Sequence, residues 1–204
     1  MEVIVSRLNL SFLTCFFITF SSIPVYAVDC YSDSPGKKDA SYETPVTVPK
    51  TISTSQIKNA NALFKGFNGK WVGDAVYVFC KGDRSSFKEQ NSGFRLEGKV
   101  ESKKNELVIN VDLSSTNTNK TLNKKLSMYI TDKFLRHNHK GKKGDIHIIS
   151  ADKNKIHYVK KHPGSAGLEE KTVVLRKLKS EFVLEQRNFV RGELASKELW
   201  VFRK

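Results

Sequence analysis

Hydrophobic and polar residues alternate with a period of two along most of the chain after residue 69. The segment from Lys70 to Lys81 is apolar on both alternating faces, one with Trp71, Gly73, Ala75, Tyr77 and Phe79, the other with Val72, Val76, Val78 and Cys80. Successive residues of a strand point to opposite sides of a sheet. The pattern therefore predicts a strand that is deeply covered on both sides.

Two half-buried strands follow this segment. One has Phe94, Leu96, Gly98 and Val100 on its apolar face, and the other has Leu107, Ile109, Val111 and Leu113. Such alternation is typical of antiparallel strands with one solvated face, and residues 102–106 are predicted to form the hairpin turn between them. Further strands are predicted at 126–130, 146–150, 156–159, 172–178, 182–190 and 198–203, separated by turn signals such as Pro163-Gly164 and Arg191-Gly192.

The number of strands and their short connections predict a mainly β fold. About eight or nine strands favour an antiparallel up-and-down β-barrel, because closure removes the exposed edges of a meander. Gly73, Gly93 and Gly98, within or beside strands, favour the tight coiling of a barrel. A two-sheet β-sandwich is the alternative.

One short helix is predicted before the first strand. Ile57, Ala60, Leu63 and Phe64 fall on one helical stripe between Gln56 and Phe64. Ser53 or Ser55 could cap its start, and Gly66 could end it. The preceding residues, 28–52, are polar with three prolines from residue 31 to 51 and read as an extended arm. The expected folded domain is residues 53–204.

The first 27 residues are predicted to be a cleavable signal peptide. Arg7 precedes an apolar run from Leu8 to Phe20, and Val25-Tyr26-Ala27 resembles a cleavage site. The run is shorter than the roughly 20 residues needed to span a bilayer. The mature chain would then be secreted or periplasmic, with no transmembrane segment expected in it.

The mature chain would retain two cysteines, Cys30 and Cys80, since Cys15 leaves with the signal peptide. Two cysteines in an oxidising compartment most simply form one disulfide, which would tie the arm to the barrel.

The sequence Gly69-Lys70-Trp71, after a short helix and at the start of the first strand, resembles the opening of the lipocalins and related calycin barrels. The resemblance implies that Trp71 closes the bottom of the barrel and stacks with an arginine near the last strand. Arg203 is the first candidate for this partner and Arg191 the second. The alternative is that Trp71 is a core aromatic residue of another β fold.

A lipocalin-like barrel implies a small apolar ligand held inside by inward side chains. The candidates to line such a site are Tyr77, Phe79, Phe94, Leu96, Ile109, Val111, Met128, Val173 and Phe182. A barrel of about eight strands has an interior that either is filled by side chains or holds one small ligand. The same residues could therefore form an ordinary core.

Charge suggests a second function. The formal net charge is +14, and basic residues cluster at Lys133, Arg136, Lys140, Lys142 and Lys143. Such a surface could dock on an anionic envelope component, either anionic lipid or acidic polysaccharide, or it could simply keep the protein soluble. Nucleic acid is not expected as a partner of an exported protein.

Catalysis, metal binding and cofactors are not expected. Motifs for a serine nucleophile elbow, a zinc protease helix and a phosphate loop are absent from the sequence. His137 and His139 have the spacing of two ligands on a strand, but the neighbouring lysines would repel a cation. An enzyme with a site dispersed over several strands remains the third hypothesis.

Overall fold

Ten antiparallel strands form one continuous sheet in the computed structural model, which describes residues 51–81, 88–138, 146–165 and 167–204. The strands are β1 (Gly69–Lys81), β2 (Lys88–Lys103), β3 (Glu106–Ser115), β4 (Thr121–Thr131), β5 (Phe134–His137), β6 (Ile146–Ala151), β7 (Lys155–Gly164), β8 (Gly167–Lys177), β9 (Glu181–Val190) and β10 (Glu193–Arg203). Their order in the sheet is β5-β4-β3-β2-β1-β10-β9-β8-β7-β6.

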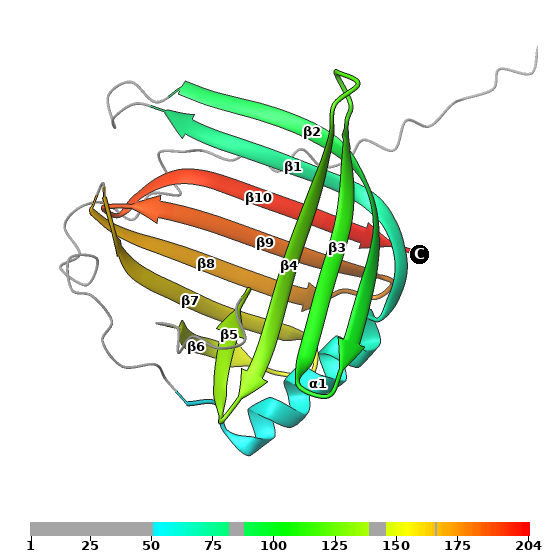
Figure 1. Cartoon of the computed structure of the whole chain (residues 1–204), viewed down its shortest axis with the longest axis vertical. Coiled ribbons are helices and arrows are strands. Elements are labelled where there is room, and N and C mark those ends of the chain that lie inside the picture. The colour runs from blue at the N-terminus through cyan, green and yellow to red at the C-terminus, as the bar shows by residue number, and fades with distance from the viewer. Residues whose placement is uncertain (1–50, 82–87, 139–145, 166) are drawn as a thin grey trace, which may run out of the picture.

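The sheet curls until its two end strands, β5 and β6, come into contact (Figure 1). Within the described residues these two strands share no hydrogen-bonded ladder, so the barrel is nearly closed and retains a seam. The predicted up-and-down barrel is confirmed, with ten strands instead of eight or nine. The alternative of a two-sheet sandwich is wrong, because neighbouring strands pair in one uninterrupted sheet.

The helix α1 (Thr54–Phe67) lies across one end of the barrel (Figure 1). Ser53 caps this helix. The Ser53 hydroxyl accepts a hydrogen bond of 3.2 Å from the backbone N–H of Gln56, and the side-chain oxygen of Gln56 accepts one of 2.9 Å from the backbone N–H of Ser53. This capping box satisfies amides that the first turn would otherwise leave unpaired. The helix buries Ala60, Leu63, Phe64 and Phe67 against the strands. No helix within the described residues is long and apolar enough to cross a membrane.

Gly69 makes the connection from α1 into β1 possible. Its φ angle is 129°, a conformation that residues with a Cβ atom rarely adopt. The chain can therefore turn sharply from the helix and place Trp71 inside the barrel two residues later, where Trp71 is buried.

The predicted signal peptide, residues 1–27, and nearly all of the arm, residues 28–52, lie outside the described residues and stay predictions. Ile52 belongs to the described part. Its side chain is buried, and its amide donates a hydrogen bond of 2.7 Å to the carbonyl oxygen of Lys133.

Candidate functional site

The end of the barrel beneath α1 is closed by aromatic side chains. Trp71 meets Phe67 and Phe182 edge to face at centroid distances of 5.3 Å, and Phe67 stacks on Phe182 at 4.4 Å. The Trp71 indole N–H donates a hydrogen bond of 2.8 Å to the carbonyl oxygen of Phe67. Trp71 thus joins the first strand to the helix at this end of the barrel.

Arg203 does not stack on Trp71. Its guanidinium pairs with Asp74 at 2.5 Å and with Glu181 at 2.8 Å, which binds the last strand to β1 and β9. The cation over the Trp71 ring is the ammonium of Lys204, 4.9 Å from the centroid. Arg191 lies in the β9–β10 turn, at the opposite end of these strands from Trp71.

The half of the interior next to α1 is filled. Met128 and Val173 have no exposed surface, and neither do many of their neighbours. Accessible surface includes the wall of any internal void that can hold a water molecule, so no such void touches these side chains. Of the nine residues predicted to line a site, seven are buried as part of this core or its rim: Tyr77, Leu96, Ile109, Val111, Met128, Val173 and Phe182.

The two remaining candidates differ. Phe94 is partly buried and packs edge to face against Tyr77 at 5.3 Å. Phe79 is 43% exposed and does not join the core, because it lies near the end of β1 that is farthest from the helix. Phe79 is therefore not part of the packed core, and its role in lining a site stays a prediction.

Polar side chains form a layer inside the barrel at the end away from α1. Tyr77 of β1 lies opposite Glu198 of β10, and Glu198 lies opposite Gln186 of β9. Trp200 lies two residues from Glu198, on the same face of β10. We call Tyr77, Gln186, Glu198 and Trp200, with the lysines Lys124 and Lys171, the open-end cluster.

Three atoms of the open-end cluster are buried and unsatisfied. Tyr77, Gln186 and Trp200 are 5%, 4% and 2% exposed. By strict hydrogen-bond geometry the Tyr77 hydroxyl, the Gln186 side-chain oxygen and the Trp200 indole nitrogen have no partner among the described residues, although the Trp200 indole and the Glu198 carboxylate lie close enough to Tyr77 to affect its pKa. A buried polar group left in this state costs about 1–3 kcal/mol, so native proteins normally supply a partner, a water molecule or a ligand.

The charges of the open-end cluster are mainly positive. The Lys124 ammonium lies 5.4 Å from the centre of the Tyr77 ring. Burial lowers the pKa of Lys171, the Glu198 carboxylate partly opposes this shift, and Lys160 and Lys124 add to it. Glu198 accepts a hydrogen bond of 3.3 Å from the Gln186 amide. Burial also raises the pKa of Tyr77, with a further contribution from Glu198 and a smaller opposing one from the nearby Trp200 indole, so its hydroxyl remains a donor at neutral pH.

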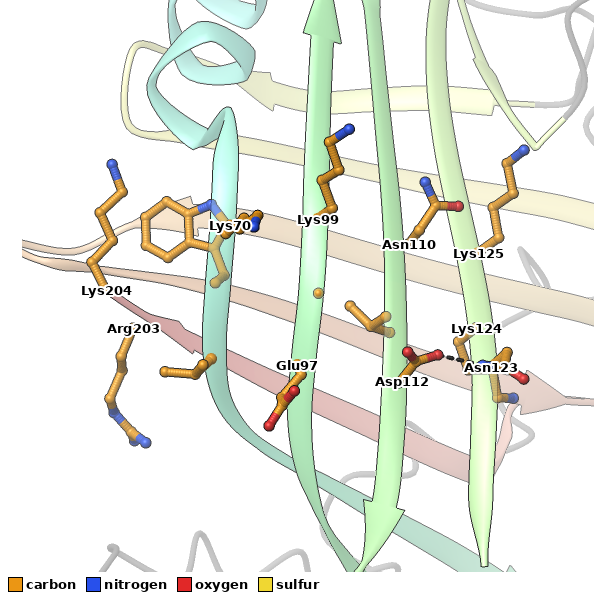
Figure 2. Close-up of a pocket in the computed structure, with 14 residues that line it drawn as sticks. Lys70, Glu97, Lys99, Asn110, Asp112, Asn123, Lys124, Lys125, Arg203 and Lys204 are labelled. Carbon is orange, nitrogen blue, oxygen red and sulfur yellow. Dashed lines mark hydrogen bonds between the residues drawn. The ribbon is translucent and has the colours of Figure 1, made fainter.

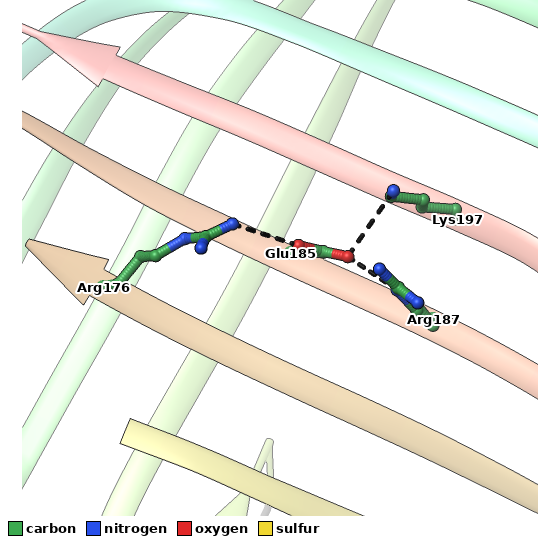
Figure 3. A network of polar contacts seen from close by, with 4 residues as sticks. All are labelled: Arg176, Glu185, Arg187 and Lys197. Atoms are coloured by element: carbon green, nitrogen blue, oxygen red, sulfur yellow. Dashed lines mark hydrogen bonds and ion pairs between the residues drawn. The ribbon is translucent and has the colours of Figure 1, made fainter. Parts of the chain in front are cut away.

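A second polar group lies on the outer face of β8, β9 and β10 (Figure 3). The Glu185 carboxylate contacts Arg187 at 2.6 Å, Arg176 at 3.4 Å and Lys197 at 3.6 Å. Burial would raise the pKa of Glu185, but the hydrogen bond from Arg187 and the three positive charges lower it overall. This carboxylate is saturated by its partners, so we assign it to holding three strands together and not to binding.

The predicted basic surface is placed only in part. Lys133 is exposed in the β4–β5 turn. Arg136 is 5% exposed, which contradicts the prediction that it belongs to an exposed basic face. Lys140, Lys142 and Lys143 lie outside the described residues, as does His139.

His137 contacts the hydroxyl of Tyr158 through Nδ1. Among the described residues no group of three histidine, cysteine or acidic side chains is arranged to hold a metal ion. Cys80 is half-buried beside Val78, Phe189 and Leu194. Cys30 lies outside the described residues, so the predicted disulfide stays a prediction.

No protein-family model and no curated protein matches this chain. A solved structure of a protein of unknown function from the DUF3598 family of Nostoc punctiforme is 11% identical, with a TM-score of 0.36, and the match covers 76% of this chain and 51% of that one. The chain thus spans about half the length of the Nostoc protein. The tesB protein of Mycobacterium avium subsp. paratuberculosis is 9% identical, with a TM-score of 0.19 and coverages of 76% and 89%. An oleoyl thioesterase of Lactobacillus plantarum is 7% identical, with a TM-score of 0.17 and coverages of 80% and 92%.

None of these three proteins is described as a lipocalin, so the lipocalin resemblance is not shown. At these TM-scores the matches carry no argument about function. The described part of the chain is a nearly closed ten-strand antiparallel β-barrel with one short helix near its N-terminal end.

Proposed function

We propose that the protein is a non-enzymatic binding protein for a small molecule that carries a carboxylate, held at the open-end cluster. The observation that supports this proposal is the pair of unused donors. The Tyr77 hydroxyl and the Trp200 indole N–H are buried close to each other, and neither forms a well-aligned hydrogen bond with a described residue. The Lys171 ammonium belongs to the same layer.

The chemistry of the cluster favours an anion. Tyrosine hydroxyl, indole N–H and ammonium groups all donate hydrogen bonds, and hydrogen bonds to a charged acceptor are about twice as strong as neutral ones. The acid Glu198 is already engaged by the Gln186 amide. A carboxylate can accept from Tyr77 and Trp200 at once, and its charge would offset the repulsion among Lys124, Lys160 and Lys171.

The packing of the barrel favours a small ligand. The interior near α1 is filled by side chains such as Met128, Val173 and Leu184, which have no exposed surface. A long apolar chain would have to displace this core, whereas a short one could rest against Phe94, which is only partly buried. The proposal therefore narrows the expected small apolar ligand to one with a short apolar part. Export to a secreted or periplasmic location belongs to the same proposal.

Nuclear magnetic resonance of the two indole N–H groups tests this directly. The Trp71 indole is already hydrogen-bonded to Phe67, whereas the Trp200 indole forms no well-aligned hydrogen bond with a described residue. We expect straight-chain carboxylates from acetate to octanoate to move the Trp200 signal downfield in a saturable way, and to leave the Trp71 signal nearly unchanged. The variant Trp200→Phe assigns the two signals.

Matched ligands and variants complete the test. The methyl esters of the same acids, which lack the charge, should bind at least about tenfold more weakly, because one lost charged hydrogen bond costs about 1.5–3 kcal/mol. Tyr77→Phe and Lys171→Met should weaken binding, whereas Lys177→Met, at the exposed end of the same strand, should not. A Trp200 signal that no carboxylate shifts would show that water alone satisfies these donors, and the proposal would be wrong.

A further inference from the structure

An open groove of about 700 Å³ lies over strands β1 to β4 (Figure 2). Exposed side chains of these strands form most of its lining, together with the end of β10 and the buried residues Trp71 and Val111. Its lining comprises Lys70, Trp71, Val72, Glu97, Gly98, Lys99, Asn110, Val111, Asp112, Asn123, Lys124, Lys125, Arg203 and Lys204. The open-end cluster consists of inward side chains, and Lys124 is the one of its members that also belongs to the lining of this groove.

One row across the groove is basic. Lys70 lies opposite Lys99, Lys99 opposite Asn110, and Asn110 opposite Lys125. Like charges at directly opposed positions of neighbouring strands destabilise a sheet. Lys99 has a partner in Glu101 at 2.7 Å, but among the described residues neither Lys70 nor Lys125 forms an ion pair. Glu101 lies beside the row and its charge also acts on Lys125, so one carboxylate partly offsets three lysines and leaves the row with a net positive charge.

A second row, two residues further along each strand, carries acceptors. Glu97 lies opposite Asp112, and Asp112 lies opposite Asn123, whose amide donates a hydrogen bond to the Asp112 carboxylate. Arg203 continues this row beyond the exposed Val72. Two residues along a strand correspond to about 6.5–7 Å, so an extended ligand of ordinary width can touch both rows.

The two rows together select the class of ligand. A membrane of anionic lipid presents a plane of negative charge, which Glu97 and Asp112 would repel. An acidic polysaccharide carries carboxylates or sulfates for the lysine row and also hydroxyl groups, which carboxylates and side-chain amides bind well. The row from Lys70 to Lys125 crosses three strand spacings, or about 14 Å, which gives a linear polymer several contacts at once.

We propose that this outer groove binds an acidic polysaccharide, whose anionic groups lie along Lys70, Lys99 and Lys125 and whose hydroxyls face Glu97, Asp112 and Asn123. The proposed site for an anionic envelope component is thus the outer face of β1–β4, in place of the predicted basic cluster between Lys133 and Lys143. Because this site and the carboxylate site involve different faces of the sheet, either can fail without the other.

Calorimetry with defined oligosaccharides tests the inference. The probes are oligomers of a uronic acid, neutral dextran oligomers of the same length, vesicles of phosphatidylglycerol, and single-stranded DNA. We expect the oligouronate to bind, to lose affinity several-fold as salt rises from about 50 to 200 mM, and to bind better than the other three probes. Tighter binding of vesicles or DNA would overturn the inference.

Two sets of variants make the test specific. Replacing Lys70, Lys99 and Lys125 with Gln should weaken oligouronate binding by at least about tenfold. The same change at the exposed lysines Lys58, Lys65 and Lys179, which removes equal charge, should weaken it no more than about twofold. Equal losses in both sets would mean that net charge alone drives binding, and the groove would not be the site.

The acceptor row supplies the opposite test. The double variant Glu97→Gln with Asp112→Asn makes the groove more positive. It would strengthen the binding of any anion that is held by charge alone. A polysaccharide that donates hydroxyl hydrogen bonds to these carboxylates should gain nothing or bind more weakly, because neutral acceptors form weaker bonds. A clear gain in oligouronate affinity would contradict the proposed orientation. Indole signals from Trp200 should stay unchanged on addition of oligouronate, which separates this site from the carboxylate site.

Discussion

Tyr77, Gln186 and Trp200 lie on the inner face of the barrel, where the polar atoms of their side chains are buried. Each could be replaced by an apolar residue of similar size without the cost of an unpaired buried group. Lys171 presents the same conflict with a full charge, because burial lowers its pKa. Residues that lower stability in this way are often those that a binding site requires.

Lys171→Met tests this conflict at a single residue. The pKa of Lys171 is lowered in the folded protein from its ordinary value of 10.5. Below the lowered pKa both states carry the proton, and the folded protein bears the cost of a buried cation. As pH rises toward 10.5 the folded state loses its proton first, so the stability of the wild type increases across that window.

We therefore expect Lys171→Met to be more stable than the wild type at pH 7, by an amount on the order of 1 kcal/mol, with the advantage shrinking as the pH approaches 10.5. Urea unfolding at several pH values measures both effects. Lys177→Met should change stability by no more than about 0.5 kcal/mol at pH 7, since Lys177 is exposed. A Lys171→Met protein that is clearly less stable at pH 7 would show that the ammonium is well satisfied by its surroundings.

At the scale of elements, the hydrophobic pattern predicted most of the strands and missed β5. That strand has four residues and follows the turn Asp132-Lys133, whose φ angles are 51° and 64°. Hairpin turns with two positive φ values usually contain glycine, and a lysine at the second position gives no such signal. The turn Arg191-Gly192, with φ angles of 52° and 78°, was predicted because its second residue is glycine.

The alternation along single strands could place some residues of the open-end cluster but not their neighbours across strands. Tyr77 was placed on the inner face by its alternation with Val76 and Val78, but as part of an apolar lining. Lys171 has the parity of Val173 and Leu175, so extending that strand by one residue would have placed it inside. The pairing of Tyr77 with Glu198, and of Glu198 with Gln186, depends on strand order and register, which no single strand's pattern reveals.

The seam between β5 and β6 depends on side-chain contacts, because these two strands do not pair within the described residues. Over the described residues the strands touch without a ladder, and the His137–Tyr158 contact reaches across from β5 to β7. Tyr158 is completely buried, and burial raises its pKa well above the usual value, so its hydroxyl keeps its proton and can donate to His137 Nδ1.

Tyr158→Phe should loosen this seam. The buried His137 nitrogen would lose this donor, at a cost of about 1–3 kcal/mol. We expect hydrogen exchange to accelerate in the β4–β5 hairpin, because β5 pairs with β4 alone among the described strands. Exchange should stay nearly unchanged in the β1–β2 hairpin far from the seam. If exchange accelerated evenly over all strands, the effect would be a general loss of stability, and the contact would have no special role at the seam.

At the scale of the whole molecule, the barrel has one end closed by α1 and carries two basic features, one inside the sheet and one on its outer face. The open-end cluster lies inside the far end, and the lysine row lies on the outer face of β1 to β4. A formal net charge of +14 raises the local concentration of anions around the whole surface, so both sites would bind faster at low salt. The selectivity of each site for its ligand therefore depends on the hydrogen-bonding groups around its lysines and not on net charge.

The predicted disulfide between Cys30 and Cys80 would link the arm to the barrel. Cys80 lies near the end of β1 beside Val78, Phe189 and Leu194, and Cys30 belongs to the predicted arm. A disulfide between them would close a loop of about 50 residues and stabilise the folded protein by roughly 4 kcal/mol, mainly by restricting the unfolded chain. Mass spectrometry of the mature protein after alkylation, with and without reductant, should show thiols at Cys30 and Cys80 only after reduction, and reductant should lower the unfolding midpoint. The double variant Cys30→Ser with Cys80→Ser should have the lower midpoint from the start and no response to reductant. Alkylation of both cysteines in the unreduced protein would show that the arm is not tied to the barrel by this bond.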